Sequence, residues 1–365
     1  MNESAEASGL LQLGWQSFRH LETASIEPCA GINVIHGRNA AGKTSLIEAI
    51  HFLARSKSFL THRMSRVIQT GASEATVWGK VDANRSIHRL GVRHGNGETR
   101  VRLNGRDVSV LSEAAWLIPL QVLNTEAQRL LTDGPAARRA FLNWGVFHVE
   151  HQYRDDWRRY QRALRQRNAA LRHGDRRLAA AWEPEMAAAG EAVDRRRRAF
   201  MQDLLPKALA MAGDWLPGID LGWQFRAGWR SGYAFAEVLA GARERELAQG
   251  FGLYGPHRAD IRFTADGVDA SGHLSRGQQK LLVAALKMAL IEYWGKASTQ
   301  RPVLLIDDLP AELDAPHRQD LTRRLEQSTA QIFLTAIDAD QLPSIQEAAW
   351  FHVEHGRISH ARGEV

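Results

Sequence analysis

Apolar residues in the first third of the chain mark short strands around one helix. Residues 31–35 form a short apolar run, which predicts a buried strand. Residues 44–54 follow with apolar side chains three and four positions apart, the spacing of one helix face: Leu46, Ile47, Ile50 and Leu53. Residues 86–93 then alternate between apolar and polar, and Asn104-Gly105 favours a tight hairpin turn. The pattern predicts a strand, a loop and a helix beside a small antiparallel sheet.

The pattern changes in the middle of the chain. From 127 to 248, Ala, Leu, Arg and Glu recur at helical spacing, with interruptions predicted at Gly174, Pro184, Pro206 and the turn at 215–218. The apolar positions do not sustain a heptad repeat, so a helical insert is expected rather than a long coiled coil. Two apolar runs near the end, 302–306 and 331–334, predict buried parallel strands. An α/β fold with a helical insert follows.

Composition excludes several classes of protein. The chain has 365 residues, 44% of them hydrophobic, which is enough to bury a substantial core. No apolar run approaches the roughly 20 residues that span a bilayer, and residues 1–6 lack the features of a signal peptide, so a cytoplasmic location is expected. The single cysteine, Cys29, excludes an internal disulfide and a site built from several thiolates.

Positive charge is concentrated in one segment. The net charge of the chain is +6, and residues 151–200 alone hold 13 Arg, no Lys and 7 acidic residues, an excess of the same size. A basic segment of this kind suits a polyanion such as nucleic acid, but a solvated helical face explains it equally well. Charge alone leaves the two interpretations open.

The strongest motif lies between the first strand and its helix. Residues 37–44 match the pattern G-x-x-x-x-G-K-[ST], in which glycines let successive backbone N–H groups face the phosphates of a nucleotide. Lys43 is expected to reach the β- and γ-phosphates, and Thr44 to ligate Mg²⁺. The predicted phosphate contacts are Gly37, Arg38, Asn39, Ala40, Ala41, Gly42, Lys43, Thr44 and Ser45.

A nucleotide hydrolase of this kind also needs a carboxylate near the metal. Asp307 follows the apolar run 303–306, and we expect it at the end of a strand adjacent to the strand of the phosphate loop. Asp308 is then placed to orient and deprotonate the attacking water. Two acids after a strand often form only a capping turn, so the pairing with the loop carries this prediction.

A second helix start has the chemistry of an anion site. Ser275 and Gly277 precede an apolar helix predicted over 280–294, and they offer a hydroxyl and a backbone N–H to an anion. An ordinary helix cap is the alternative. Because the chain already has a phosphate loop, this turn is expected to serve a nucleotide held by another subunit.

Together these motifs resemble those of ABC-type ATPases. The matching elements are Walker A at 37–44, the Q-loop residue Gln121, the signature at 274–278, Walker B at 304–308, the D-loop at 311–314 and the switch residue Thr335. More narrowly, four runs resemble the RecF family of bacterial recombination mediators: Ser17-Phe18-Arg19, residues 135–142, Gln166-Arg167-Asn168 and residues 255–260.

The resemblance implies an α/β P-loop NTPase of the ABC/SMC-head type with an antiparallel β subdomain and a helical lobe. The ATPase domain would be discontinuous, 1–126 and 249–365, with the lobe at 127–248. The implied cofactors are ATP and Mg²⁺. The implied partners are a second copy of the chain, gapped DNA with its single-strand/double-strand junctions, and RecR and RecO, with which it would load RecA on single-stranded gaps.

The resemblance also implies roles for individual residues. Catalysis would involve Asp308, Lys43, Gln121 and Thr335, and Mg²⁺ would be held by Thr44, Asp307 and Gln121. Ser275, Gly277 and Gln278 would add nucleotide contacts from the signature. The candidate DNA contacts are Arg138, Arg139, Arg195, Arg196, Arg197 and Arg198.

Departures from the ABC pattern predict slow hydrolysis, and the family resemblance implies that DNA stimulates it. The signature has Arg276 where a second glycine is usual, the acid after Walker B is Asp308 rather than Glu, and the switch residue is Thr335 rather than His. A shorter carboxylate and a neutral switch residue hold the water less favourably. Leu60 stands where the family has an arginine, and Arg63 is a candidate substitute.

Three other functions fit parts of this sequence. The nucleotide-binding subunit of a transporter would have a shorter helical region than the insert at 127–248. A nuclease of the overcoming-lysogenisation type would carry an acidic cluster after Val353, which the sequence lacks. A DNA scaffold with a degenerate loop would not keep Lys43, Thr44 and Asp307 intact.

Overall fold

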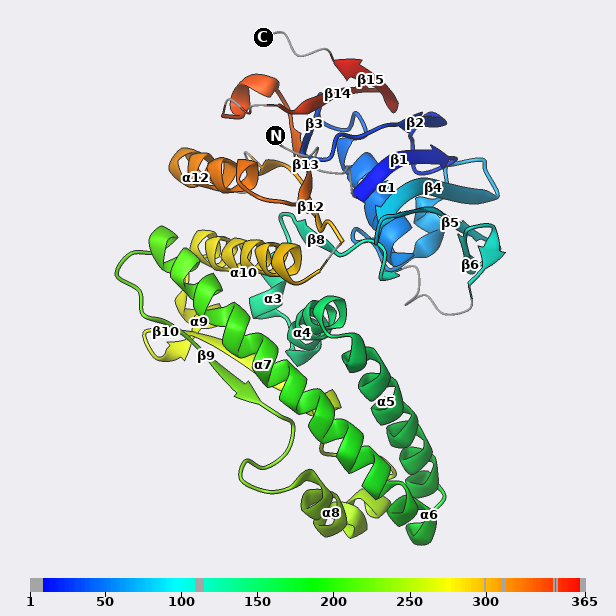
Figure 1. Cartoon of the computed structure of the whole chain (residues 1–365), viewed down its shortest axis with the longest axis vertical. Coiled ribbons are helices and arrows are strands. Elements are labelled where there is room, and N and C mark those ends of the chain that lie inside the picture. The colour runs from blue at the N-terminus through cyan, green and yellow to red at the C-terminus, as the bar shows by residue number, and fades with distance from the viewer. Residues whose placement is uncertain are drawn as a thin grey trace. The chain divides into compact units, whose positions relative to one another are not determined.

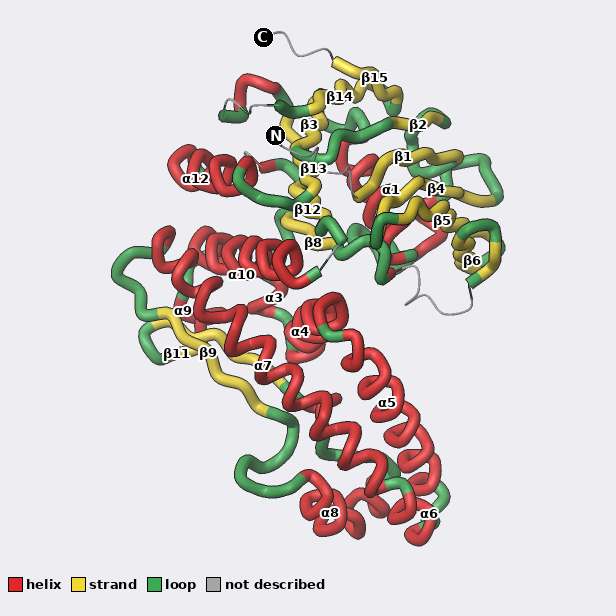
Figure 2. The backbone as a smooth tube through the Cα atoms, in the orientation of Figure 1, coloured by secondary structure: helices red, strands yellow, loops and turns green. Residues whose placement is uncertain are grey.

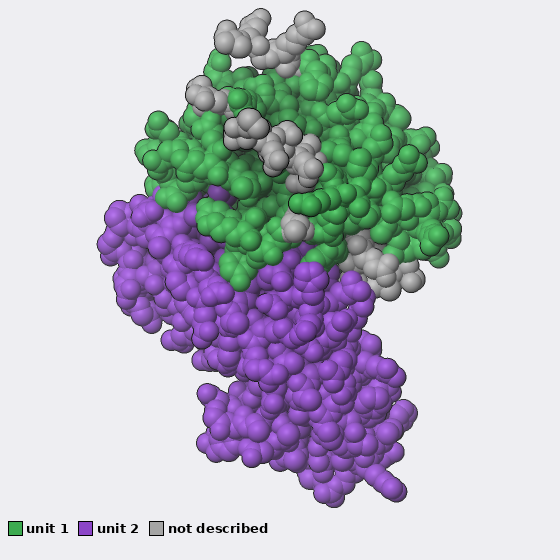
Figure 3. Space-filling view, viewed as in Figure 1, with its two compact units in different colours: residues 1–127, 291–365 green, residues 128–290 purple. Residues whose placement is uncertain are grey.

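The computed structural model describes residues 9–108, 115–298, 300–309, 313–343, 345 and 347–361. These residues form two compact units (Figure 3). Unit 1 comprises residues 1–127 and 291–365, and unit 2 comprises residues 128–290. No described helix is long and apolar enough to cross a membrane.

A parallel sheet forms the centre of unit 1, in the strand order β15-β14-β3-β13-β12-β8. Its strands are β3 (Ile32–His36), β8 (Leu120–Leu123), β12 (Val303–Ile306), β13 (Gln331–Ala336), β14 (Ala349–Glu354) and β15 (Arg357–Ala361). All neighbours are parallel except β14 and β15. The two predicted parallel strands, at 302–306 and 331–334, are therefore confirmed, and both are fully buried.

A second sheet of unit 1 is antiparallel, in the order β2-β1-β4-β5-β6-β7. Its strands are β1 (Gly9–Gln16), β2 (Ala24–Ile26), β4 (Glu74–Ala83), β5 (Ser86–Gly95), β6 (Glu98–Leu103) and β7 (Arg106–Asp107). Asn104 and Gly105 join β6 to β7 with φ of 52° and 83°, the left-handed pair that a two-residue hairpin turn requires. The predicted antiparallel sheet and its hairpin are confirmed.

Helix α1 (Lys43–Arg55) packs against strands of both sheets (Figure 1). Its side chains are buried from Lys43 to Ala54 with the single exception of Thr44. One continuous core, which includes Trp15, Phe52 and Phe333, surrounds the helix. The other helices among the described residues of unit 1 are η1 (Met64–Val67), α12 (Ala315–Glu326) and η3 (Ala339–Gln341).

Unit 2 consists of helices with one small sheet (Figure 2). The helices are α3 (Arg129–Thr132), α4 (Pro135–Val149), α5 (His151–Arg172), α6 (Arg176–Ala181), α7 (Glu183–Trp215), α8 (Phe235–Gln249), η2 (Pro256–Arg258) and α9 (Ala270–His273). The strands, in sheet order, are β11 (Val268–Asp269), β10 (Asp260–Ala265) and β9 (Leu221–Arg226). Helix α10 (Arg276–Ala297) crosses from unit 2 into unit 1.

Two features of unit 2 differ from the predicted pattern. Helix α7 runs through Pro206, so the interruption predicted there is wrong. Leu204, Leu205 and Ala208 are buried on this helix, and that packing offsets the hydrogen bond that proline removes. Strand β9 was not predicted, and it pairs with β10 along its whole length. This pairing holds residues 260–265 to the insert, and unit 2 continues to Leu290, beyond the predicted lobe end at 248.

His257 is a partly buried, neutral histidine in unit 2. Its Nδ1 accepts a hydrogen bond from the Tyr160 hydroxyl at 2.5 Å, and its Nε2 lies 3.2 Å from the carbonyl oxygen of Gly252. Burial, reinforced by the nearby Arg258, lowers the pKa of His257 to about 4. Burial likewise lowers the pKa of His51 in α1 to about 3.

These histidines make stability depend on pH. In the unfolded chain His257 becomes protonated below about pH 6.5, whereas in the folded protein it becomes protonated only near pH 4. Stability is therefore complete above pH 6.5 and falls towards pH 4, by up to about 1.4 kcal/mol per pH unit for each histidine. Denaturant unfolding at several pH values should show a smaller loss in His257→Gln than in the wild type. His173→Gln, a change at an exposed position, is the control. If both variants show the same slope of unfolding free energy against pH, the lowered pKa of His257 is contradicted.

Candidate nucleotide-binding site

The phosphate loop joins the end of β3 to the start of α1. Gly37 has φ of 149°, and a Cβ there would meet the carbonyl oxygen of Val353 at 2.1 Å, so only glycine fits. Gly42, immediately before the helix, has φ of 122°. The loop therefore closes tightly at both ends, and the N-terminus of α1 opens onto it as an anion site.

Lys43 reaches back across the loop. Its Nζ donates to the carbonyl oxygens of Gly37 at 2.6 Å and Arg38 at 3.1 Å. Burial lowers the pKa of the Lys43 ammonium, and the carboxylates of Asp308 and Asp307 oppose that shift. An anion bound in the loop would add to the charges that stabilise the ammonium form.

A chain of hydrogen bonds joins the loop to the ends of β12 and β13. Asp307 Oδ1 accepts from the hydroxyls of Thr44 and Thr335, each at 3.0 Å. The Thr335 hydroxyl in turn accepts from the backbone N–H of Asp308 at 2.7 Å. Asp308 has φ of 58°, a left-handed conformation that aspartate tolerates better than most residues. Residues from three separate segments thus form one connected group.

The strand that carries Asp307 is not adjacent to the strand of the phosphate loop. The sequence predicted that β12 and β3 would be neighbours, and this is wrong because β13 lies between them. The end of β13 places Thr335 in the gap, where its hydroxyl bonds to Asp307. The carboxylate and the loop are brought together across an intervening strand.

Asp307 suits a divalent cation. Burial raises the pKa of its carboxyl group, against the lowering effects of its bonds to Thr335 and Thr44. A nearby cation would offset the cost of burying this charge. The carboxylate and the Thr44 hydroxyl are oxygen donors of the kind Mg²⁺ prefers. The described residues include no cluster of three His, Cys, Asp or Glu.

Gln121 lies on β8, the strand beside β12, opposite Leu304. It is buried, with 7% of its surface exposed. Within the described ranges its side chain makes no hydrogen bond to Asp307 or Thr44, so its predicted metal contact stays a prediction. The D-loop residues Ala311 and Glu312 lie outside the described residues.

The signature residues form the first turn of α10 in unit 2. The Ser275 hydroxyl accepts from the N–H of Gln278 at 3.3 Å, and the Gln278 side chain accepts from the N–H of Ser275 at 2.9 Å, which is a reciprocal helix cap. Ser275, Arg276 and Gly277 are exposed. A Cβ added to Gly277 would meet no atom of this chain within 4 Å.

The run Ser17-Phe18-Arg19 holds helix α1 in place. Arg19 forms a bidentate ion pair with the fully buried Glu48 of α1, at 2.6 and 2.7 Å. Glu48 also accepts from the Ser58 hydroxyl in the segment that follows the helix. Leu60 and Arg63 are exposed in that segment, and neither forms a described contact with the phosphate loop.

A pair of histidines next to the phosphate loop was not predicted from the sequence. His36, at the end of β3, pairs in register with His352 of β14, and their ring centroids are 4.9 Å apart. Burial lowers the pKa of His36, and His352 lowers it further. The two histidines are far apart in the chain, so only strand pairing reveals them.

The candidate DNA contacts divide into interior and exposed arginines. Arg197 is completely buried and donates to Tyr153, Asn143 and the Pro256 carbonyl, so the DNA contact predicted there is wrong. Arg138 is held by Asp260 through two hydrogen bonds of 2.8 and 3.1 Å, with only 12% of its side chain exposed.

The other four arginines differ in their partners. Arg139 donates to the carbonyl of Ala259, and Arg196 is paired with Glu150 and Asp156. Arg198 pairs with Asp194 but remains 48% exposed. Arg195 is exposed and forms no ion pair among the described residues. Of the six candidate arginines, Arg195 and Arg198 are the two that offer substantial surface to a polyanion.

Two of the runs that carry the family resemblance are partners in space. Arg138 and Arg139, in the run 135–142, bind the side chain of Asp260 and the carbonyl of Ala259, in the run 255–260. The arginines are about 120 residues away from their partners along the chain. The run 255–260 therefore anchors helix α4 within unit 2 through these hydrogen bonds.

Comparisons with known proteins agree with this architecture. The family model described as "RecF/RecN/SMC N terminal domain" matches residues 10–359. "DNA replication and repair protein RecF" of Stutzerimonas stutzeri (strain A1501) is 40% identical over 372 residues, covering 97% of this chain and 98% of that protein. The protein of the same name from Shewanella baltica (strain OS155 / ATCC BAA-1091) is 38% identical, covering 96% and 99%.

Solved structures share the fold. A structure described as the "recombination mediator protein RecF-ATP in RecFOR pathway" has a TM-score of 0.86 at 22% identity, covering 99% of this chain and 100% of that chain. The Smc head domain of Pyrococcus furiosus has a TM-score of 0.62 at 14% identity, covering 97% and 96%. The predicted ABC/SMC-head fold is confirmed, and a transporter subunit is not favoured. The chain belongs to the RecF family of DNA replication and repair proteins.

Proposed function

We propose that the chain binds ATP with Mg²⁺ and hydrolyses it slowly, in a cycle that controls its dimerisation on DNA. The observation that carries this proposal is the hydrogen-bonded group of Thr44, Asp307, Thr335 and Asp308 beside the phosphate loop. In this proposal the group would supply metal ligands and a candidate base beside the γ-phosphate. Bound Mg²⁺ would neutralise phosphate charge, and Thr44 and Asp307 would hold it.

Asp308 acts as the base in this proposal. It is only partly buried, so water can reach its carboxylate, and its N–H is fixed by the Thr335 hydroxyl. The carboxylate would accept the proton of the attacking water. Because Thr335 is neutral and already bonded to both aspartates, it adds no charge to the transition state, which favours slow turnover.

The signature serves a nucleotide bound by a partner subunit. Ser275 and Gly277 are exposed, and no atom of the described residues explains a glycine at position 277. A bulky nucleotide edge approaching from a second copy would explain it. Two composite sites would then form in each symmetric dimer, and ATP would join the copies.

The DNA role rests on the family and on charge. The named relatives are DNA replication and repair proteins, and Arg195 and Arg198 keep exposed surface in the basic insert. We propose that the dimer binds gapped DNA and single-strand/double-strand junctions in the cytoplasm. With RecR and RecO it would help to load RecA on the gap, and the DNA would stimulate hydrolysis.

Asp308→Asn tests the base. Asparagine adopts the left-handed conformation of this position readily, so the fold and the bond to Thr335 are kept. ATP binding should be unchanged, hydrolysis should fall about 100- to 10,000-fold, and dimers should accumulate on DNA. Steady-state ATPase at the wild-type rate, measured alongside nucleotide binding, would show that another group positions the water.

A mixture of two variants tests the composite site. Lys43→Ala should abolish ATP binding, and Ser275→Arg should block dimerisation while monomers still bind ATP. In a mixed dimer both lesions fall in one composite site and leave the other intact. A 1:1 mixture should therefore regain part of the ATP-dependent dimer measured by light scattering.

The control for this experiment is each variant alone, which should form no ATP-dependent dimer. If loop and signature acted within one chain, every chain in the mixture would carry a lesion and nothing would be restored. That result, with both variants folded and Ser275→Arg still binding ATP, contradicts the intersubunit site.

A further inference from the structure

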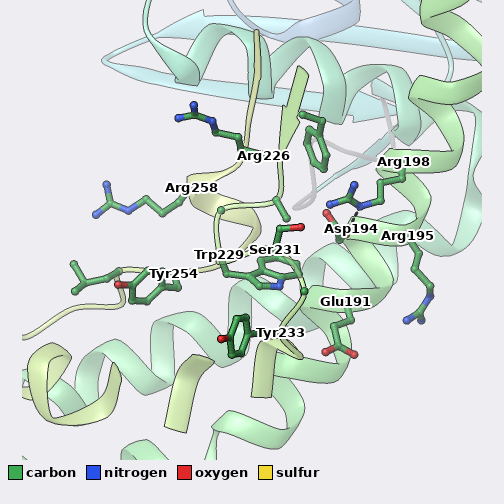
Figure 4. A pocket seen from close by; sticks show the side chains of 15 residues that line it. Glu191, Asp194, Arg195, Arg198, Arg226, Trp229, Ser231, Tyr233, Tyr254 and Arg258 are labelled. Atoms are coloured by element: carbon green, nitrogen blue, oxygen red, sulfur yellow. Dashed lines mark hydrogen bonds and ion pairs between the residues drawn. The ribbon is translucent and has the colours of Figure 1, made fainter. Parts of the chain in front are cut away.

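Unit 2 contains a cavity lined by arginines and aromatic rings (Figure 4). It has a volume of about 760 Å³, within the range of cavities that hold small molecules and nucleotides. Helix α7, the end of β9 with its following loop, and residues 253–258 line it. All of these segments belong to one compact unit. The proposed chemistry of hydrolysis uses none of its residues.

Most of the charge in this cavity is uncompensated. Arg195, Arg226 and Arg258 are exposed and form no ion pair among the described residues. Several other arginines of the unit are paired with acids, among them Arg138, Arg159, Arg167, Arg196 and Arg243. Positive side chains kept unpaired around one cavity favour an anionic occupant.

Each of the two carboxylates at the cavity wall already accepts a hydrogen bond from a neighbouring residue. Asp194 accepts from Arg198 Nε at 2.7 Å, and Glu191 accepts from the backbone N–H of Phe235 at 3.0 Å. Among the described residues, neither carboxylate forms an ion pair with Arg195, Arg226 or Arg258. With four arginines and two acids, the lining carries an excess of two positive charges.

Aromatic rings supply the second half of the site. Trp229 stacks on the buried Phe235, with centroids 4.6 Å apart, and also lines the cavity. Tyr233 is 45% exposed, and Tyr254, which also lines the cavity, is drawn to the left of Trp229 in Figure 4. Exposed rings beside arginines are the pattern that binds unstacked bases and their phosphates.

We propose that this cavity binds unpaired nucleotides of single-stranded DNA. The arginines would contact phosphates, and bases would stack on Trp229 and Tyr233. Duplex DNA does not satisfy the site, because its base faces are stacked inside the helix. The inference rests on the proposed DNA role and deepens it: unit 2 would sense the single-stranded side of a gap.

Charge and stacking can be tested separately. Arg195→Gln, Arg226→Gln and Arg258→Gln combined should weaken binding of a labelled oligothymidylate, measured by fluorescence anisotropy. The slope of log K against log salt should become shallower by about 2, since each lost single-strand phosphate contact removes about 0.7. The matched control is Arg162→Gln, Arg165→Gln and Arg245→Gln combined, exposed arginines of the same unit outside the cavity, which should leave the slope unchanged.

Tyr233→Leu tests the stacking. The side chain is exposed and has no hydrogen bond within the described ranges, so the fold should persist, as circular dichroism would verify. Binding should weaken roughly 5- to 100-fold with an unchanged salt slope. Photocrosslinking of a 4-thiothymidine oligonucleotide to the wild type should map to residues 226–234.

Three outcomes would overturn the inference. If the wild type binds duplex DNA with ATP but neither cavity variant alters single-strand binding, the cavity assignment is wrong and the proposed function stands. If an acidic peptide such as polyglutamate, and not DNA, loses binding in the arginine variant, the occupant is a protein. If the wild type binds no DNA with or without ATP, the proposed DNA role fails and the inference fails with it.

Discussion

The burial of helix α1 is the constraint on which unit 1 depends. A helix that begins in a phosphate loop must expose its N-terminus to the nucleotide, yet all but one of its side chains from Lys43 to Ala54 are buried. Two sheets are needed to cover such a helix, one parallel and one antiparallel. The buried carboxylate of Glu48 then requires a partner, and Arg19 supplies it with two hydrogen bonds. The two sheets and the Arg19–Glu48 ion pair thus fix the position of helix α1, and with it the phosphate loop.

Unit 2 uses arginine as an interior residue. Arg167 is fully buried between Glu183 and Glu246, and Arg197 is fully buried beside Tyr153. Removing either arginine would leave buried polar groups unsatisfied, which is a costly change. A large part of the positive charge in the insert therefore stabilises the fold. The arginines left without acidic partners stand out against this background, and those of the α7 cavity lie around aromatic rings.

The nucleotide site combines parts that are complete with parts that need a partner. Within one chain, Thr44 is already hydrogen-bonded to Asp307, and Lys43 to the carbonyl oxygens of Gly37 and Arg38. Gly277 shows no internal reason to be glycine. A site divided in this way would couple hydrolysis to assembly, because the γ-phosphate would be enclosed only when a second copy supplies its signature turn.

The phosphate loop, its helix, the buried strands and the pair Asp307 and Asp308 could be predicted from the sequence, because contiguous spacing encodes all of these. The sequence did not determine that β13 lies between β3 and β12, since strand order depends on pairing between distant segments. Nor did it separate Arg197, buried against Pro256, from the exposed Arg195 two positions away. Adjacent arginines on a helix point in different directions, and the acids and carbonyls that receive them lie up to about 120 residues away. Only the tertiary structure brings those partners together, so only it decided which charges are structural and which face solvent.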